Sequence, residues 1–167
     1  MLYFAYGSNM LTKRLHAANR APSAVAVGIG FVNGRRLTFD KVSSDGAGKC
    51  DIEASGNSAC RVYGVLFELA ESDKPQLDRA EGLGKGYREE NVEVVTSSGL
   101  RNAFTYVATA KNPTLVPYHW YKDLVLAGAT EHDLPEAYIE RLRTFDSKFD
   151  PDNKRRAENE LLLFESK

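Results

Sequence analysis

Two segments with the pattern of β-hairpins constrain the fold of this chain more than any other feature. In the first, the valine- and isoleucine-rich stretch 24–32 leads into Asn33-Gly34, a dipeptide that favours a tight hairpin turn. Apolar residues then alternate at Leu37 and Phe39, as they do on a half-buried strand. The sequence therefore predicts an antiparallel pair of strands joined at Asn33-Gly34.

The second hairpin is predicted from strands at 88–96 and 102–109, which flank the turn sequence Ser97-Ser98-Gly99. Two further apolar runs, 2–6 and 62–69, have the length and composition of buried strands. Because hairpins outnumber strand–helix–strand units, we expect an α+β fold rather than a doubly wound parallel sheet. The predicted architecture is a single domain with a mixed, barrel-like β-sheet and flanking helices.

Four segments carry apolar residues at helical spacing, and they begin at Asn9, Ser72, Pro117 and Pro135. Asn9 and Ser72 are residue types that cap helix N-termini, so we expect each to cap its helix. The first helix should extend through Ala18. Gly82 lies just past the end of the second helix, where a glycine is typical.

The chain length of 167 residues fits one domain, which we place at residues 1–150. The stretch 43–59 is rich in glycine, serine and aspartate and has no period, so we interpret it as one long flexible loop. Residues 151–167 form a charged tail that ends in an apolar cluster. Either a terminal helix or a strand fits that tail.

Charge and composition give no reason to expect nucleic acid or a membrane as a partner. The 22 basic and 23 acidic residues balance to a net charge of -1, and no apolar run reaches the ~20 residues of a membrane span. The first six residues lack the features of a signal peptide. Cys50 and Cys60 are too few for a disulfide framework, so we expect reduced thiols and a cytoplasmic protein.

The junction Tyr6-Gly7-Ser8-Asn9 is the first candidate site. A glycine allows a ligand to approach the backbone closely, and the amides of a first helical turn have no partner within the helix. With the helix dipole, they favour binding of a carboxylate or an oxyanion. An ordinary tight connection with a capping asparagine explains the same residues equally well.

Glu81 is the second candidate, because it falls at the predicted end of a helix, where the dipole disfavours a carboxylate. Glycines at 82, 84 and 86 follow it, which indicates a loop able to close over a site. A solvated surface glutamate is the simpler reading of the local pattern.

Six tyrosines are candidates for a site or for the core, and we expect at least half of them to be core residues and nothing more: Tyr6, Tyr87, Tyr106, Tyr118, Tyr121 and Tyr138. The three histidines show no metal-ligand spacing, so we expect no metal. No signature of a serine or cysteine nucleophile is present.

Taken together, these motifs resemble the γ-glutamylcyclotransferase family. The segment Tyr3-Phe4-Ala5-Tyr6-Gly7-Ser8-Asn9-Met10 is similar to its N-terminal signature, and Leu77-Asp78-Arg79-Ala80-Glu81-Gly82 matches the position of its glutamate. The stretch 121–142 resembles the C-terminal helices of the family. The resemblance covers residues 3 to about 145.

The resemblance implies a barrel-like α+β domain without a cofactor and with a small γ-glutamyl compound as its ligand. In the implied reaction the substrate's α-amine attacks its own γ-carbonyl, which gives 5-oxoproline and releases an amino acid or amine. The loop Tyr6–Asn9 would bind the γ-glutamyl group, Glu81 would act as general acid and base, and Tyr87, Tyr106 and Tyr121 would line the pocket. We expect burial under 82–86 to raise the pKa of Glu81.

Free γ-glutamyl-amino acids are the default substrates that the resemblance implies. Two alternatives stay open: the same chemistry on γ-glutamylamines or a γ-glutamyl-protected metabolite, and a non-catalytic relative that binds γ-glutamyl ligands. The sequence leaves the oligomeric state open between monomer and homodimer.

Overall fold

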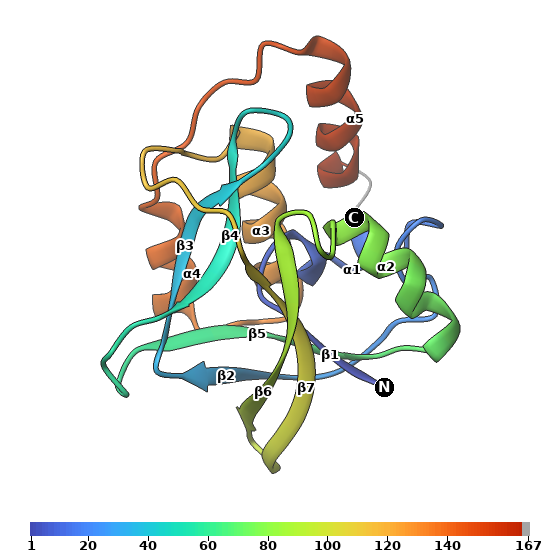
Figure 1. Cartoon of the computed structure of the whole chain (residues 1–167), viewed down its shortest axis with the longest axis vertical. Coiled ribbons are helices and arrows are strands. Elements are labelled where there is room, and N and C mark those ends of the chain that lie inside the picture. The colour runs from blue at the N-terminus through green and yellow to red at the C-terminus, as the bar shows by residue number, and fades with distance from the viewer. Residues whose placement is uncertain (165–167) are drawn as a thin grey trace.

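A closed five-stranded barrel lies at the centre of the computed structural model, which describes residues 1–164 (Figure 1). The strand order is β1-β5-β2-β6-β7. β1 (Leu2–Ala5) closes the barrel, because it pairs antiparallel with β5 (Arg61–Glu68) and parallel with β7 (Gly99–Ala108). β2 (Val25–Asn33) and β6 (Tyr87–Thr96) complete it. The expected single-domain α+β fold with a mixed barrel-like sheet is confirmed.

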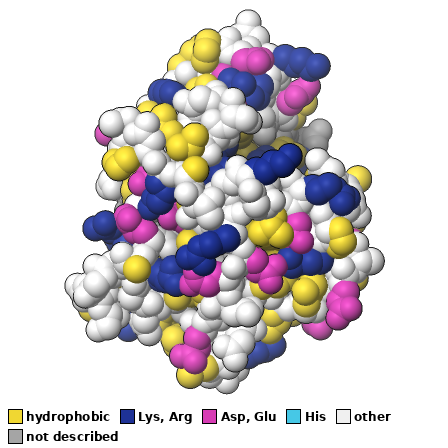
Figure 2. Space-filling model, viewed as in Figure 1, with side chains coloured by type: hydrophobic (Ala, Val, Ile, Leu, Met, Phe, Trp, Pro, Cys, Tyr) yellow, Lys and Arg dark blue, Asp and Glu magenta, His cyan; other side chains and the backbone are white. Residues whose placement is uncertain are grey.

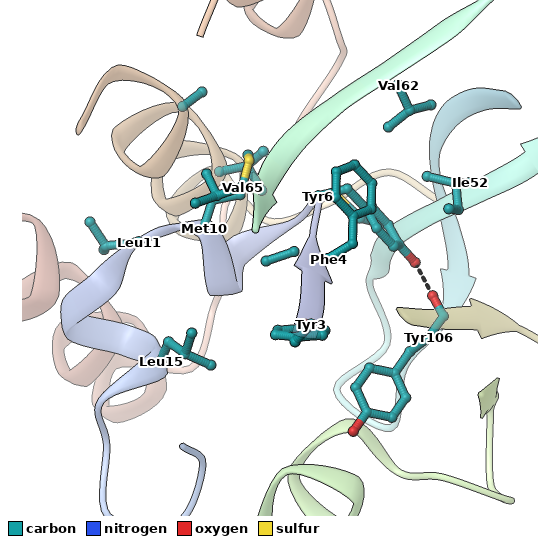
Figure 3. Close-up of a cluster of buried hydrophobic side chains, with 14 of the residues drawn as sticks. Tyr3, Phe4, Tyr6, Met10, Leu11, Leu15, Ile52, Val62, Val65 and Tyr106 are labelled. Carbon is teal, nitrogen blue, oxygen red and sulfur yellow. Dashed lines mark hydrogen bonds between the residues drawn. The ribbon is translucent and has the colours of Figure 1, made fainter. Parts of the chain in front are cut away.

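β1 is the strand that carries the candidate loop, and close packing fixes its position. Phe4 is fully buried, and a Cβ on Gly64 of β5 would lie 2.7 Å from its ring and 2.4 Å from the carbonyl oxygen of Ala5. Only glycine at position 64 therefore lets β5 approach β1 so closely. Figure 3 shows Phe4 and Tyr6 packed in the apolar cluster together with Val62 and Val65 of β5. Burying one such side chain contributes roughly 1.5–3 kcal/mol.

The prediction of a hairpin at Asn33-Gly34 was wrong. Gly34 does make a tight turn, with φ of 73°, but β3 (Arg35–Val42) then leaves the barrel and pairs with β4 in a separate two-stranded sheet. The reason is that β2 already pairs with β5 and β6. A strand in a closed barrel has no free edge for its sequence neighbour.

The prediction of one flexible loop over 43–59 was also wrong. β4 (Gly48–Ala54) lies inside this stretch and pairs antiparallel with β3. Cys50, Asp51 and Ile52 are all buried, so the strand is covered on both faces. A strand of mixed polarity buried on both faces lacks the alternating pattern by which strands are recognised in sequence.

The helix expected from Asn9 through Ala18 is much shorter in the structure. A 3-10 turn (Ser8–Met10) is followed by α1 (Thr12–Leu15), and the extended conformation of Leu11 separates them. Asn9 is not a cap, because its side chain makes no capping hydrogen bond. The helix dipole at this loop is therefore small, since α1 has only 4 residues.

α2 (Lys74–Glu81) ends as predicted at Gly82, whose φ of 71° is the left-handed conformation of a helix-ending glycine. The predicted cap at Ser72 was wrong. Ser72 lies inside a 3-10 turn, Glu71–Asp73, that precedes α2, and the N-terminus of α2 has no side-chain cap. In Figure 1 α2 lies beside the upper ends of β6 and β7.

The helices predicted after Pro117 and Pro135 are confirmed as α3 (His119–Glu131) and α4 (Glu136–Arg143). α3 supports the candidate loop directly. A Cβ on Gly128 would lie 2.5 Å from the backbone nitrogen of Leu11 and 2.7 Å from the backbone carbon of Met10. Glycine therefore lets α3 rest on the turn that contains Ser8 and Asn9.

The charged tail forms a helix, α5 (Asn153–Phe164), which packs beside α3 (Figure 1). Asp150 anchors it, because this buried carboxylate accepts hydrogen bonds from Trp120 at 2.8 Å and Arg155 at 2.6 Å. Of the stretch 151–167 that we assigned to the tail, 165–167 lie outside the described residues.

None of the helices within residues 1–164 is long and apolar enough to cross a bilayer. On the face shown in Figure 2, lysine and arginine side chains alternate with aspartate and glutamate. This face therefore presents mixed charge rather than one broad patch of a single sign.

Candidate active site

A pocket opens where the end of β1, the turn Ser8–Met10, α2, α3 and β4 meet β6 and β7. All eight residues that the sequence singled out for the site line it, together with two others. The lining residues are Tyr3, Tyr6, Gly7, Ser8, Asn9, Cys50, Glu81, Tyr87, Tyr106 and Tyr121. The two candidate motifs, far apart in the sequence, thus share one cavity.

Asn9 and Glu81 are in direct contact at the wall of this pocket. The Asn9 side-chain amide donates to Glu81 Oε1 at 2.7 Å and to the Tyr3 hydroxyl at 3.1 Å. Arg20 joins the same network, because its guanidinium donates to Glu81 Oε1 at 2.8 Å and to Asn9 Oδ1 at 3.1 Å. Every hydrogen-bonding atom of the Asn9 side chain is thereby used, which fixes its orientation.

This network explains how a carboxylate is held at the C-terminal end of α2. The helix dipole opposes a negative charge there, and the Glu81 side chain is only 17% exposed. Arg20 and Asn9 offset that cost with two charge-assisted hydrogen bonds. Among the described residues, the hydrogen bonds and the ion pair of Glu81 are all to Oε1, so Oε2 is the oxygen available to a ligand.

The loop backbone offers hydrogen-bond donors to the same cavity. The amides of Met10 and Leu11 are bound to the carbonyl oxygens of Gly7 and Ser8. For the amides of Ser8 and Asn9, no backbone acceptor is recorded within residues 1–164. Such free N–H groups at the start of a turn suit a carboxylate or an oxyanion.

Gly7 lies in close contact with its neighbours. A Cβ at this position would lie 3.1 Å from the Cβ of Cys50 and 3.4 Å from the hydroxyl of Tyr121. Glycine therefore brings the loop against β4 and α3.

Three buried tyrosines tie the pocket walls together through backbone groups. Tyr87 donates to the carbonyl oxygen of Cys50 at 2.6 Å, and Tyr121 accepts from the amide of Cys50 at 3.1 Å. Tyr6 donates to the carbonyl oxygen of Tyr106, as Figure 3 shows. Burial raises the pKa of Tyr6, Tyr87 and Tyr121 well above the ordinary value. These phenols therefore stay neutral, with Tyr6 and Tyr87 as hydrogen-bond donors and Tyr121 as the acceptor of the Cys50 amide.

Tyr106 connects the pocket to α2. Its hydroxyl, which Figure 3 shows pointing away from the apolar cluster, donates to Asp78 at 2.7 Å. Burial, and then this bond to a carboxylate, raise the pKa of Tyr106. Lys74 completes the link, because its ammonium lies 2.5 Å from both Asp78 and Glu89.

Cys50 does not have the properties of a nucleophile. Burial raises the pKa of its thiol to about 12, so the thiolate is absent near neutral pH. Glu81 is thus the pocket-lining carboxylate that can exchange protons there. Within residues 1–164 no group of three or more histidine, cysteine, aspartate or glutamate side chains is arranged to hold a metal ion.

The tyrosine prediction was partly wrong. Tyr118 and Tyr138 lie outside the pocket, but Tyr6, Tyr87, Tyr106 and Tyr121 all line it, so fewer than half belong to the core alone. Their spacing in the sequence shows no common face, because Tyr6 lies just after β1 and the others come from β6, β7 and α3.

Tyr3, Arg20 and Cys50 were not singled out from the sequence. Tyr3 carried one usable signal, since it lies three residues before Tyr6 in the same buried strand segment. Arg20 follows α1 in irregular structure, and Cys50 lies in the stretch interpreted as a loop. Neither has a local pattern that indicates a site.

The chain is similar to several known proteins in sequence and in fold. Residues 61–142 match the model of the AIG2-like family. The chain is 31% identical over 153 residues to a mouse protein named gamma-glutamylcyclotransferase, and the match covers 87% of this chain and 78% of the mouse protein. A bovine protein of the same name is 32% identical over 152 residues, with the same coverage. A solved structure named gamma-glutamyl cyclotransferase superimposes with a TM-score of 0.85 at 28% identity, over 98% of both chains.

Proposed function

Because the chain belongs to the γ-glutamylcyclotransferase family, we propose that it converts γ-glutamyl compounds into 5-oxoproline and releases an amino acid or amine. The observation that carries the proposal is the contact between Asn9 and Glu81 at 2.7 Å, which joins the loop and the carboxylate inside one pocket. The proposed glutamyl-binding loop and the proposed proton-transfer group thus line the same pocket.

The substrate binds with its glutamyl part among the tyrosines. Its α-carboxylate accepts hydrogen bonds from the free amides of Ser8 and Asn9, and its α-ammonium lies beside Glu81 Oε2. The neutral hydroxyls and rings of Tyr6, Tyr87 and Tyr121 surround the chain between them. Folding the glutamyl chain onto itself supplies much of the rate, since well-oriented intramolecular reactions gain roughly 7–11 kcal/mol.

Glu81 then moves the protons. It takes one proton from the α-ammonium, and the freed amine attacks the γ-carbonyl carbon, which forms the new C–N bond of the five-membered ring. Attack leaves a negative charge on the former carbonyl oxygen and one surplus proton on the ring nitrogen. Glu81 gives its first proton to the leaving nitrogen, and the bond to that nitrogen breaks as the oxyanion re-forms the carbonyl. Glu81 then takes the surplus proton from the ring nitrogen and passes it to the released amine, which restores the carboxylate. One positioned acid–base group is typically worth about 10²–10⁴-fold in rate.

A substrate panel tests the proposal. The full chain is incubated with γ-glutamyl dipeptides and γ-glutamylamines, and 5-oxoproline is measured. Formation from at least one compound supports the cyclotransferase. If none yields 5-oxoproline while the folded protein binds a γ-glutamyl compound in calorimetry, the chain is a non-catalytic relative and the proposed activity is wrong.

We also propose a cytoplasmic location. Cys50 and Cys60 are both free thiols, which is ordinary in a reducing compartment. Fractionation of cells that express the chain tests this, and recovery outside the cytoplasmic fraction would contradict it.

A further inference from the structure

A second pocket adjoins the first and differs from it in charge. The two share Ser8, Glu81, Tyr87 and Tyr121 in their walls, so they form one continuous cleft. The outer pocket adds Ala80 and three cations, Arg14, Arg20 and Lys49. The inner pocket is lined by phenols, a thiol and amides, with Glu81 as its one charged residue.

The position of Glu81 orients the substrate along this cleft. Since Glu81 lines both pockets, the bond that breaks lies at their boundary. The glutamyl part occupies the inner pocket with its tyrosines and loop amides. The leaving group therefore extends into the outer pocket, where the cations are.

The cations of the outer pocket are not all neutralised by acids. Arg20 is paired with Glu81 at 2.8 Å, and Lys49 is paired with Asp45 at 2.9 Å. Arg14 has no acidic partner recorded within residues 1–164, and its one hydrogen bond is to the side-chain oxygen of Asn159 at 3.2 Å. The pocket therefore carries an excess of positive charge.

Arg14 also has an unused donor. Its Nε is buried and has no hydrogen-bond partner among the described residues. A buried guanidinium N–H without an acceptor is costly, and a ligand that supplies an acceptor relieves that cost. A carboxylate matches a guanidinium in charge and in geometry.

Lys49 is held at the wall of the same pocket by aromatic rings. Its ammonium lies 4.3 Å from the ring centre of Trp120 and 4.4 Å from that of Tyr121. These contacts keep the charge in place although water is largely excluded. Burial lowers the pKa of Lys49 to about 8, so it is mainly protonated at neutral pH.

We propose that Arg14 and Lys49 form the subsite for the carboxylate of the leaving amino acid, and that they select γ-glutamyl-amino acids over γ-glutamylamines. This inference rests on the proposed cyclotransferase activity. It assigns a specificity role to two residues outside the glutamyl-binding loop.

A matched substrate pair isolates the carboxylate. γ-Glutamyl-alanine and γ-glutamyl-ethylamine differ only in the carboxylate of the leaving group. We expect the wild-type chain to show a kcat/KM at least about tenfold higher for γ-glutamyl-alanine, because a hydrogen bond between charged groups typically contributes that much or more. Equal values for the two substrates would overturn the inference and leave the proposed function intact.

Variants then assign the preference to residues. Arg14→Gln and Lys49→Met should each raise KM for γ-glutamyl-alanine by about tenfold or more and leave KM for γ-glutamyl-ethylamine within about twofold. Lys49→Arg should restore much of the preference, since it keeps the charge. If Arg14→Gln and Lys49→Met raise KM equally for both substrates, the two residues are structural.

Failure of the carboxylate subsite and failure of the proposed cyclotransferase activity give different results. Melting curves identify a variant that fails to fold. If Arg14→Gln does not fold, Arg14→Lys replaces it. For Arg14→Lys we expect a smaller rise in KM, seen with γ-glutamyl-alanine and not with γ-glutamyl-ethylamine. Absence of 5-oxoproline from both substrates with folded wild-type protein would contradict the proposed function itself.

Discussion

Asn9 and Glu81 are 72 residues apart in the chain, yet the amide of one donates to the carboxylate of the other at 2.7 Å. Asn9 follows β1 in a turn held by α3, and Glu81 ends α2. The barrel thus brings the end of its first strand against the end of a helix that follows β5. The hydrogen bond sets where a proton acceptor lies relative to the free amides of the loop.

Glu81→Gln tests the acid–base role. Glutamine keeps the shape of the side chain and can still accept a hydrogen bond from Arg20, but it does not take up a proton near neutral pH. We expect kcat to fall by about 10²–10⁴-fold, with KM within a few-fold of wild type, in an assay of 5-oxoproline release. The melting temperature serves as the control, and near-normal turnover in a folded variant would rule out the mechanism.

Asn9→Asp tests whether the contact itself matters. The substitution is nearly isosteric, but it removes the donor to Glu81 and Tyr3 and places a second carboxylate beside the first. Like charges so close repel, so we expect kcat/KM to fall at least about tenfold, or ~1.4 kcal/mol of barrier. Asn102→Asp, at an exposed position of β7, is the matched control. Equal effects of the two substitutions would count against a specific role of Asn9.

Part of the site could be predicted from the sequence because its signals are local. The end of α2 at Gly82 and the junction after β1 both depend on residues close together in the chain. Arg20 and Cys50 could not be predicted, because their places depend on tertiary packing. Cys50 lies on a strand that pairs with β3, and β3 leaves the barrel only because closure occupies both edges of β2.

The error at Asn9 has a similar cause. Asparagine before a helical pattern is normally a cap, and the local sequence contains no reason to expect otherwise. In the structure its side chain is bound by Tyr3, Arg20 and Glu81, two of which come from other segments of the chain. The capping prediction was wrong because the Asn9 side chain is used for the hydrogen bond to Glu81 instead.

Gly128→Ala tests the support that α3 gives to the loop. Alanine in a helix is ordinarily favoured over glycine by about 1 kcal/mol. Here the new Cβ would lie 2.5 Å from the backbone nitrogen of Leu11, so the turn or the helix must move. We therefore expect a loss of about 1–3 kcal/mol in the free energy of unfolding, together with reduced turnover.

Denaturant titration measures the effect of Gly128→Ala, and Thr130→Ala is its control. Thr130 is exposed on the same helix, so its change should stay within about 0.5 kcal/mol. A Gly128→Ala variant that is more stable than wild type would show that helix propensity outweighs the contact with the turn.

Lys49→Met tests whether the outer pocket holds a buried positive charge. The measurement is how the free energy of unfolding depends on pH. Burial lowers the pKa of Lys49 to about 8 in the folded protein, against an ordinary value of 10.5. The unfolded chain therefore binds more protons between these pH values, so the folded wild type gains stability as pH rises through that range. Below about pH 8 the cost of the buried ammonium is present in full, and above about pH 10.5 it is gone.

The charged groups that face Lys49 set the size of this effect. Asp45 favours the protonated form, whereas Arg14 of α1 and Lys41 of β3 oppose it, and the rings of Trp120 and Tyr121 cover the ammonium. Replacement by methionine also removes the ion pair with Asp45, but the pKa of about 8 already includes the attraction of Asp45, so the sign of the pH dependence is unchanged. The difference in unfolding free energy, variant minus wild type, should therefore be more positive at pH 7 than at pH 10, by on the order of 2–3 kcal/mol. Urea titrations of both proteins at the two pH values measure it, and a difference that does not change with pH would mean that Lys49 keeps an ordinary pKa and is not buried as a cation.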